Sequence, residues 1–439
     1  MKSFIKAALM GALFTSLATL PAQAAVDGET QFLLNTFLFL VMGALVMWMA
    51  AGFAMLESGL VRSKNVGAIC LKNISLFAVA CIMFMLCGYN LLYGVDEGGY
   101  LGTFAFWAAD DSGVLAEGAV IEGGYAAASD FFFQVVFVAT AASIVSGTIA
   151  ERVKLFPFLI FTAILAAVIY PVQASWVWGQ GWLTAMGFKD FAGSTLVHST
   201  GGWAALVGAV LLGARRGKYG ADGKPRPMPG SNLTLATLGT FILWLGWFGF
   251  NGGSQLAFGS AADGVAVSNI ILNTNMAACG GVVAAMIVTR LVYGKVDLSM
   301  VLNGALAGLV SITASPDTPT LGIATLIGAV GGVLVVFTVP LLDKLKIDDV
   351  VGAIPVHLVC GIWGTLAVSL TADVSFVTQL IGVTAIGAWV VVASLVAWLA
   401  LKLTVGIRLS PEEEDLGTDI TELGLEAYPE FGRGSQKLV

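Results

Sequence analysis

The sequence predicts an all-α polytopic membrane protein with eleven transmembrane helices. Three observations support this fold class. The 439 residues are 57% hydrophobic and only 11% charged, with a mean hydropathy of +0.89, whereas about a quarter of the residues in a soluble domain are charged. Apolar segments long enough to cross a bilayer recur along the chain, separated by short polar loops. A pattern that contains a histidine occurs twice, each time inside an apolar segment.

Residues 1–24 are predicted to be a cleaved secretory signal peptide. Lys2 and Lys6 precede the apolar run 7–20, and the small-x-small pattern AQA follows at 22–24. The alternative is an uncleaved first span, but an apolar run of about 14 residues is short for crossing a bilayer. The transmembrane domain is therefore expected to cover residues 25–407.

The apolar segments of the mature chain predict its spans. They are residues 33–60, 67–92, 131–150, 155–176, 194–214, 232–256, 266–289, 299–315, 320–341, 351–371 and 376–401. With the signal peptide removed, an odd number of spans places the N-terminus outside the cell and the C-terminus in the cytoplasm. We expect the protein in the inner (plasma) membrane, in direct contact with lipid.

The distribution of basic residues supports this orientation, because lysine and arginine prefer cytoplasmic loops. The loops predicted to lie inside, with the ends of their spans, contain Arg62, Lys64, Arg152, Lys154, Arg215, Arg216, Lys218, Lys224, Arg226, Arg290, Lys295, Lys344, Lys346, Lys402 and Arg408. Lys189 is the only basic residue in the predicted outer loops. The long outer loop 93–130 has acidic residues but no basic one. The net charge of −7 includes no basic patch that would indicate nucleic-acid binding.

The repeated pattern predicts two halves of five helices with opposite orientation in the membrane. Asp190, Gly193, Val197, His198 and Gly202 have the same spacing as Asp349, Gly352, Val356, His357 and Gly361. The two copies lie on the fifth and tenth predicted spans, so an inverted repeat with its functional site at the interface of the halves is expected. Each aspartate begins its helix, where a structural capping role is favoured over direct contact with a ligand.

The two histidines are the strongest candidates for function. At a rise of 1.5 Å per residue, each lies about 12 Å beyond its aspartate, so both should reach the middle of the bilayer and could touch. An ionisable group at that depth indicates a functional site, and two imidazoles can share a proton and offer hydrogen bonds to a small molecule. The alternatives are buried neutral histidines that only bond neighbouring helices, or ligands of a b-type haem in an electron carrier.

Several long motifs resemble the ammonium transporter (Amt/Rh) family on its bacterial Amt branch. They are DFAGSTLVHSTGGWAALVGAVLLGARRG, FFQVVF, GTIAERVK, WLGWFGFNGGS, SMVLNGALAGLV and IPVHLVCGIWGTL. The resemblance covers essentially the whole mature chain. It implies eleven spans, a homotrimer with one pore per subunit, and conduction of ammonium or ammonia, with methylammonium as a further substrate. It implies neither an enzymatic reaction nor a cofactor. An ammonium sensor or receptor with little net transport is the alternative function.

The resemblance also assigns roles to individual residues. His198 and His357 match the paired pore histidines. Phe137, Trp178 and Ser254 match an outer site that recruits the cation, and Phe137 and Phe250 match a paired phenyl gate, with Phe133 one turn before Phe137 on the same helix. Asp190 matches an aspartate required near the outer site. The predicted topology independently brings these aromatic residues toward the outer face.

Three further features have structural interpretations. We expect Glu57 to reach toward the inner surface or pair with Arg62 or Lys64, with a functional role as the alternative. We expect Trp176 and Trp247 to belong to the interfacial aromatic belt. The five cysteines contain no CxxC pair, so no disulfide framework or metal site is indicated.

The acidic tail 408–439 is predicted to be cytoplasmic. Its composition alone predicts a solvated, partly disordered segment. The family resemblance implies instead a regulatory region that packs against the cytoplasmic face and communicates with a PII-type signal protein.

Overall fold

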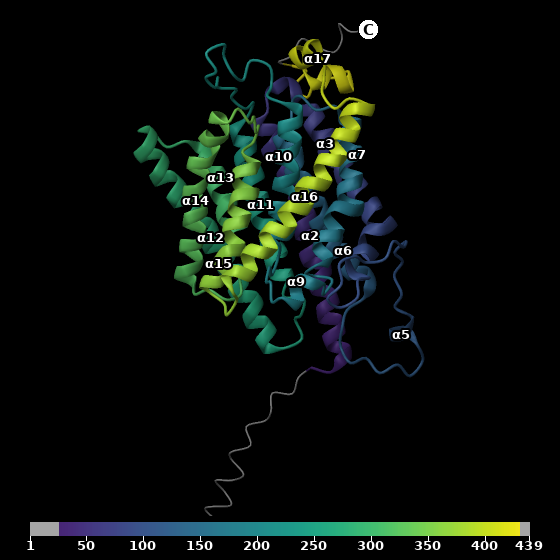
Figure 1. The fold of residues 1–439 in the computed structure, drawn as a ribbon. Helices are drawn as coiled ribbons and strands as arrows, with labels where there is room; N and C mark the ends of the chain where they lie inside the picture. The colour runs from purple at the N-terminus through teal and green to yellow at the C-terminus, as the bar shows by residue number, and fades with distance from the viewer. Residues whose placement is uncertain (1–25, 431–439) are drawn as a thin grey trace, which may run out of the picture.

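The computed structural model describes residues 26–430 as a tall bundle of helices (Figure 1). The predicted signal peptide at residues 1–24 lies outside the described residues. Within the described range the regular structure is helical, apart from two isolated bridges that join Val153 to Arg408 and Tyr219 to Pro225.

The helical spans coincide one for one with the eleven predicted segments. Nine of them, counted over residues 26–430, are long and apolar enough to cross a membrane, and two shorter apolar helices complete the set. The long spans are Gly28–Leu60, Ser63–Tyr93, Ala127–Thr148, Leu155–Ser175, Ser194–Leu212, Leu233–Gly253, Ala261–Tyr293, Leu321–Lys344 and Phe376–Thr404, and the shorter ones are Leu298–Ile312 and Ile354–Leu370.

Several of these spans are interrupted rather than continuous α-helices. A π-helical turn at Phe84–Gly88 joins α3 (Val66–Met83) to α4 (Tyr89–Tyr93), and another at Leu165–Ile169 joins α7 (Leu155–Ile164) to α8 (Tyr170–Ser175). Two more π-helical turns, Ser194–Ser199 and Ile354–Val359, precede α10 (Thr200–Leu212) and α15 (Cys360–Ala367) and carry the two histidines. π-helical turns are rare in proteins, and those that occur often lie at functional sites.

The two ends of the bundle differ. α2 (Gly28–Leu60) begins at the lower end in Figure 1, which also holds the long loop with α5 (Ser112–Leu115) and the short α9 (Trp182–Ala185). The C-terminal α17 (Pro411–Leu416) lies at the upper end. An odd number of crossings brings the two ends of the chain to opposite faces.

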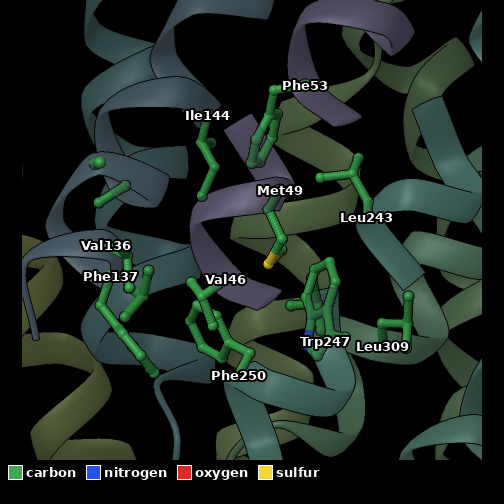
Figure 2. Close-up of a cluster of buried hydrophobic side chains, with 14 of the residues drawn as sticks. Val46, Met49, Phe53, Val136, Phe137, Ile144, Leu243, Trp247, Phe250 and Leu309 are labelled. Atoms are coloured by element: carbon green, nitrogen blue, oxygen red, sulfur yellow. The ribbon is translucent and has the colours of Figure 1, made fainter. Parts of the chain in front are cut away.

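The central helices carry the residues of interest. In α6 (Ala127–Thr148), 89% of the most apolar stretch is buried, against 33% in α12 (Ala261–Tyr293). Figure 2 shows the buried cluster that α6 forms with α2 and with α11 (Leu233–Gly253). The remaining spans are the shorter α13 (Leu298–Ile312) and the long α14 (Leu321–Lys344) and α16 (Phe376–Thr404). Apolar side chains exposed on the outside of the bundle, such as Phe241 of α11 and Leu326 of α14, suit contact with lipid.

Helices α2 and α11 approach each other very closely because glycines lie in their contact. A Cβ at Gly239 would lie only 2.3 Å from the backbone N of Leu56, and one at Gly52 would lie 2.9 Å from the backbone N of Leu243. Small residues allow this approach between transmembrane helices. The approach holds α11 against α2, and Trp247 and Phe250 of α11 are fully buried within the bundle (Figure 2).

The C-terminal segment packs against the bundle over its described length, which differs from the partly disordered tail that composition alone predicts. The backbone N of Leu409 donates to the O of Arg152 at 3.1 Å. Further along, the fully buried Asp419 accepts bonds from the backbone N atoms of Gly67 and Ala68 at 3.0 and 2.9 Å. An acidic side chain that caps the first turn of a helix neutralises unpaired backbone donors, which explains why this carboxylate is buried.

Candidate functional site

An aromatic cavity of about 570 Å³ lies among the start of α6, the end of α8 and the end of α11. Five of the residues that the sequence singles out line it: Phe133, Phe137, Trp178, Asp190 and Ser254. Its wall also contains Tyr89, Tyr93, Tyr125 and the carboxylate of Asp130. A cavity of this size with aromatic walls can receive a small cation.

The cavity ends at two phenyl rings in close contact. The ring centroids of Phe137 and Phe250 are 4.0 Å apart, and both side chains are buried. Phe133 packs edge-on against Phe137, with centroids 4.9 Å apart. Figure 2 shows Phe137 on the α6 side of the cluster and Phe250 on the α11 side. Because the rings touch, the cavity closes at this point.

Polar atoms orient the aromatic wall of the cavity. The indole Nε1 of Trp178 donates to the backbone O of Asp190 at 3.1 Å, and the ring of Trp178 stands edge-on to Phe137 at 6.0 Å. The hydroxyl of Ser254 donates to the O of Phe250 at 2.8 Å. Since that bond uses the hydroxyl proton, the oxygen lone pairs of Ser254 remain acceptors for a cation.

The two histidines meet behind the phenyl rings. The Nδ1 atoms of His198 and His357 are 3.3 Å apart, and both residues are almost fully buried. The ring of His198 also stacks on Phe250, with centroids 5.3 Å apart. One Nδ1–H must donate to the other Nδ1, so the neutral pair shares a single proton between the rings. The Nε2 of His198 has no hydrogen-bond partner within the described protein.

The aspartates fix the turns that carry these histidines. Both oxygens of Asp190 accept backbone N–H bonds of 2.8–3.0 Å, from Gly193, Ser194, Thr195 and Leu196. Asp349 accepts bonds from Gly352 at 3.2 Å and Ile354 at 2.7 Å. These bonds satisfy the first donors of each helix, which have no helical partner.

A glycine in the left-handed region follows each aspartate three residues later. Gly193 has φ of +110° and Gly352 has φ of +81°, a conformation that glycine adopts without a steric penalty. The chain can therefore fold back onto the carboxylate in both copies of the repeat.

The two copies of the repeat cross through equivalent glycines. A Cβ at Gly202 would lie 2.6 Å from Leu358, and a Cβ at Gly361 would lie 3.1 Å from Ser199. In the repeat, Gly202 corresponds to Gly361 and Ser199 to Leu358, so the two contacts are reciprocal. This reciprocity is the relation that a pseudo-two-fold axis produces, and the axis passes near the histidine pair.

Two further cavities lie beyond the histidines, toward the end of the bundle that carries α17. A small cavity of about 10 Å³ is lined by His357, Glu57 and Asn303, and a polar cavity of about 390 Å³ is lined by Asn303, Arg215 and Asp349. The two cavities share Asn303 as a lining residue. The aromatic cavity, the phenyl rings, the histidines and these two cavities therefore follow one another through the bundle.

Comparison with known proteins identifies this arrangement. The model of the Ammonium Transporter Family matches residues 37–428, which contain all of the cavities and both histidines. The chain belongs to the ammonium transporter family. It is therefore a multi-pass α-helical membrane protein from a family of transporters.

Individual relatives match over nearly their whole length. Ammonium transporter Amt2 of Archaeoglobus fulgidus is 44% identical over 423 residues, which cover 89% of this chain and 87% of the relative. Ammonium transporter 1 of Dictyostelium discoideum is 34% identical over 90% of this chain and 87% of its own. Among solved structures, a sensor Amt protein matches with a TM-score of 0.83 and 36% identity, covering 90% of this chain and 99% of that one. Candida albicans Mep2 matches with a TM-score of 0.78 and 28% identity, covering 93% and 94%.

Trp247 is a site residue that the sequence reasoning missed. It was expected in the interfacial belt, but its side chain is fully buried and stacks on His198 with centroids 4.9 Å apart. Its Nε1 donates to the Oγ1 of Thr313 at 2.8 Å. The spacing of three residues between Trp247 and Phe250 puts both on one face of α11, and this signal could have identified Trp247 as part of the site.

The expectation for Glu57 is also wrong. Arg62 does not reach it but forms a salt bridge with Glu151, with Nη2 and Oε2 2.5 Å apart. Lys64 instead donates to the backbone O atoms of Glu414 and Asp415 in the C-terminal segment. Glu57 points into the bundle, because Ser146 and Asn73 on neighbouring helices provide donors for its carboxylate.

Proposed function

We propose that this protein carries ammonium across the membrane by separating it into ammonia and a proton. The cation is recruited in the aromatic cavity, loses its proton near Phe137 and Phe250, and passes His198 and His357 as neutral ammonia. The observation that carries the proposal is a continuous row of ring contacts from the cavity to the histidine pair, through Trp178, Phe137, Phe250 and His198.

Recruitment follows from the chemistry of the cavity wall. An aromatic face attracts a cation by about 0.5–2 kcal/mol, and the rings of Phe137 and Trp178 both line the cavity. The oxygen of Ser254 adds an acceptor for an N–H group. The same contacts suit methylammonium, which carries the same charge and keeps three N–H donors.

Loss of the proton follows from the cost of burying charge. A charged group at the bilayer centre costs about 3 kcal/mol or more, whereas ammonia is neutral. The touching rings of Phe137 and Phe250 exclude a hydrated ion until they move apart, so the species that passes them leaves its water behind. Beyond the rings, the unpartnered Nε2 of His198 can replace one hydrogen bond that ammonia made to water.

The proposed assembly rests on the resemblance to the family, and the proposed orientation rests on the distribution of basic residues. We infer a homotrimer with one pore per subunit in the inner membrane, with residues 1–24 removed and the N-terminus outside. The basic residues near α17 support a cytoplasmic location for that end. The packed C-terminal segment is proposed as the contact for a PII-type signal protein that regulates transport.

One observation favours a second candidate function. A solved structure that matches over 90% of this chain is described as a sensor Amt protein. The chain could accordingly report the ammonium concentration through its C-terminal segment, with little net transport. Transport measurements on the purified protein distinguish these functions directly.

The test is an ammonium pulse on proteoliposomes, recording both the current on a solid-supported membrane and the internal pH with an enclosed dye. We expect a saturable current in the wild type that is lost in His198→Ala/His357→Ala. Empty liposomes provide the background, because ammonia also crosses lipid unaided. Internal alkalinisation above this background without current would indicate a neutral ammonia channel, and neither signal would support the sensor.

A further inference from the structure

Glu57 is a buried carboxylate that the proposed conduction path does not use. It lies on α2 with only 1% of its surface exposed. Its Oε2 accepts hydrogen bonds from the hydroxyl of Ser146 at 2.7 Å and from Nδ2 of Asn73 at 3.2 Å. Its Oε1 has no partner within the described protein. An ionisable group in the interior of a membrane protein indicates a function, and here one oxygen remains free to perform it.

The small cavity connects this carboxylate to the histidine pair. Glu57 and His357 line the same cavity, whose other walls are mostly apolar. Its volume of about 10 Å³ is close to the minimum that holds one water molecule, and ammonia has a similar size. Asn303 and Val351 line both this cavity and the larger polar cavity. A group bound here would therefore contact the histidine on one side and the polar cavity on the other.

A buried lysine contacts the same serine as the carboxylate. Lys72 on α3 is also buried, and its Nζ donates to the backbone O of Ser146 at 2.7 Å. Ser146 thus contacts both charged side chains, through its hydroxyl and its carbonyl. An opposite charge nearby lowers the cost of burying an ionised carboxylate, and Lys72 provides one through the shared contact with Ser146.

We propose that Glu57 is a proton acceptor beside the pore, which takes over the proton that reaches the histidine pair. This role rests on the proposed function, because it requires that a proton accompanies ammonia. A single molecule of water in the small cavity accepts the proton as the N–H bond of His357 breaks, and gives its own proton to Oε1 of Glu57. The carboxylic acid then releases that proton back through the small cavity, past Asn303, to water in the polar cavity and returns to the carboxylate.

The test separates the movement of charge from the movement of ammonia in the same proteoliposomes. Glu57→Gln keeps the shape of the side chain and an acceptor for Ser146 but removes the proton-accepting carboxylate. We expect the current to fall by about a hundredfold or more, because a positioned acid–base group typically contributes about 10²–10⁴-fold to a rate. Internal alkalinisation should rise at the same time, because ammonia that enters without its proton binds one inside.

Two further variants distinguish loss of proton transfer from damage to the structure. Glu57→Gln/Lys72→Met removes both charges of the buried pair, so no isolated charge remains, and it should show the same loss of current and gain of alkalinisation. Glu57→Asp keeps a carboxylate and should retain current. A normal current in Glu57→Gln would overturn the proposal. So would a folded double variant that loses ammonia entry together with current.

The wild-type result distinguishes this inference from the proposed function. If the wild type alkalinises the interior without any current, conduction of ammonia stands and the role of Glu57 as a proton acceptor is wrong. If the wild type gives neither signal, the transport function itself fails, and the role of Glu57 fails with it.

Discussion

The Nδ1 atoms of His198 and His357 are 3.3 Å apart, although the residues are separated by 159 positions in the chain. The contact joins the fifth and tenth spans at the point where the two halves of the repeat cross. Since each ring completes the hydrogen bond of the other, the pair should act as one unit rather than as two independent side chains.

The histidine pair should therefore show strong non-additivity. We expect His198→Ala and His357→Ala each to reduce the ammonium-driven current nearly as much as the double variant, because either change removes the shared hydrogen bond. A double-mutant cycle on current amplitudes checks this. Effects that simply multiply in the double variant would show that the rings act separately.

Recruitment in the aromatic cavity should depend on Trp178. We expect Trp178→Leu to raise the ammonium concentration for half-maximal current by about 2-fold to 30-fold, which corresponds to the loss of one cation–π contact. The maximal current should change less, because the phenyl rings and histidines are untouched. Trp176→Leu is the matched control, since Trp176 is not among the residues that line the cavity. Equal shifts in both variants would contradict a specific role for Trp178.

The loop before the tenth span should make stability sensitive to acid. Burial raises the pKa of Asp348, but the hydrogen bonds and charge of Arg215, with the charge of Arg152, outweigh it and lower the pKa to about 2. A carboxylate with a lowered pKa stabilises the fold above its unfolded pKa of about 4 and loses that contribution as the pH falls toward 2. The shift corresponds to about 2 kcal/mol.

The measurement is thermal unfolding of the detergent-solubilised protein between pH 5 and the lowest pH at which it stays soluble. We expect Asp348→Asn to unfold at a lower temperature at pH 5 and to depend less on pH than the wild type. An unchanged pH dependence in this variant would assign the acid sensitivity to other carboxylates.

The C-terminal segment should detach when its buried carboxylate is neutralised. Asp419→Asn replaces a charged acceptor for the backbone N atoms of Gly67 and Ala68 with a weaker one. We expect faster hydrogen exchange over residues 411–428 in the variant, while the transmembrane helices keep their protection. Glu412→Gln is the control, because Glu412 is exposed on the same segment. Similar exchange in both variants would show that Asp419 does not hold the segment.

Hydropathy and repetition were sufficient to predict most of the architecture. All eleven predicted spans are helices, because lipid requires long apolar segments whose backbone bonds are satisfied internally. The duplicated Asp-x-x-Gly and Val-His pattern predicted two central histidines, and their contact agrees with it. Boundaries were less accurate: the predicted span 266–289 extends to Ala261–Tyr293, since a helix can continue into polar residues beyond the apolar core.

The partners of individual side chains were not predictable in the same way. Glu57 lies near the predicted end of its apolar segment, where surface charges are common, whereas Trp247 lies well inside the predicted span 232–256. Helix packing instead turns Trp247 onto His198 and directs Glu57 toward Ser146 and Asn73. The orientation of Glu57 does not follow from its position along its own helix, whereas the spacing between Trp247 and Phe250 indicates only that they share a face of α11.

The sequence by itself determined the number of spans, the family and the two residues at the centre of the site, because these depend on local apolar length and on motifs within single segments. Only the tertiary structure decided which side chains share a cavity with the histidines and how the C-terminal segment is held. The physical reason is that burial and hydrogen bonding of Glu57, Trp247 and Asp419 depend on donors and rings from distant helices. Those groups come together only when the helices pack.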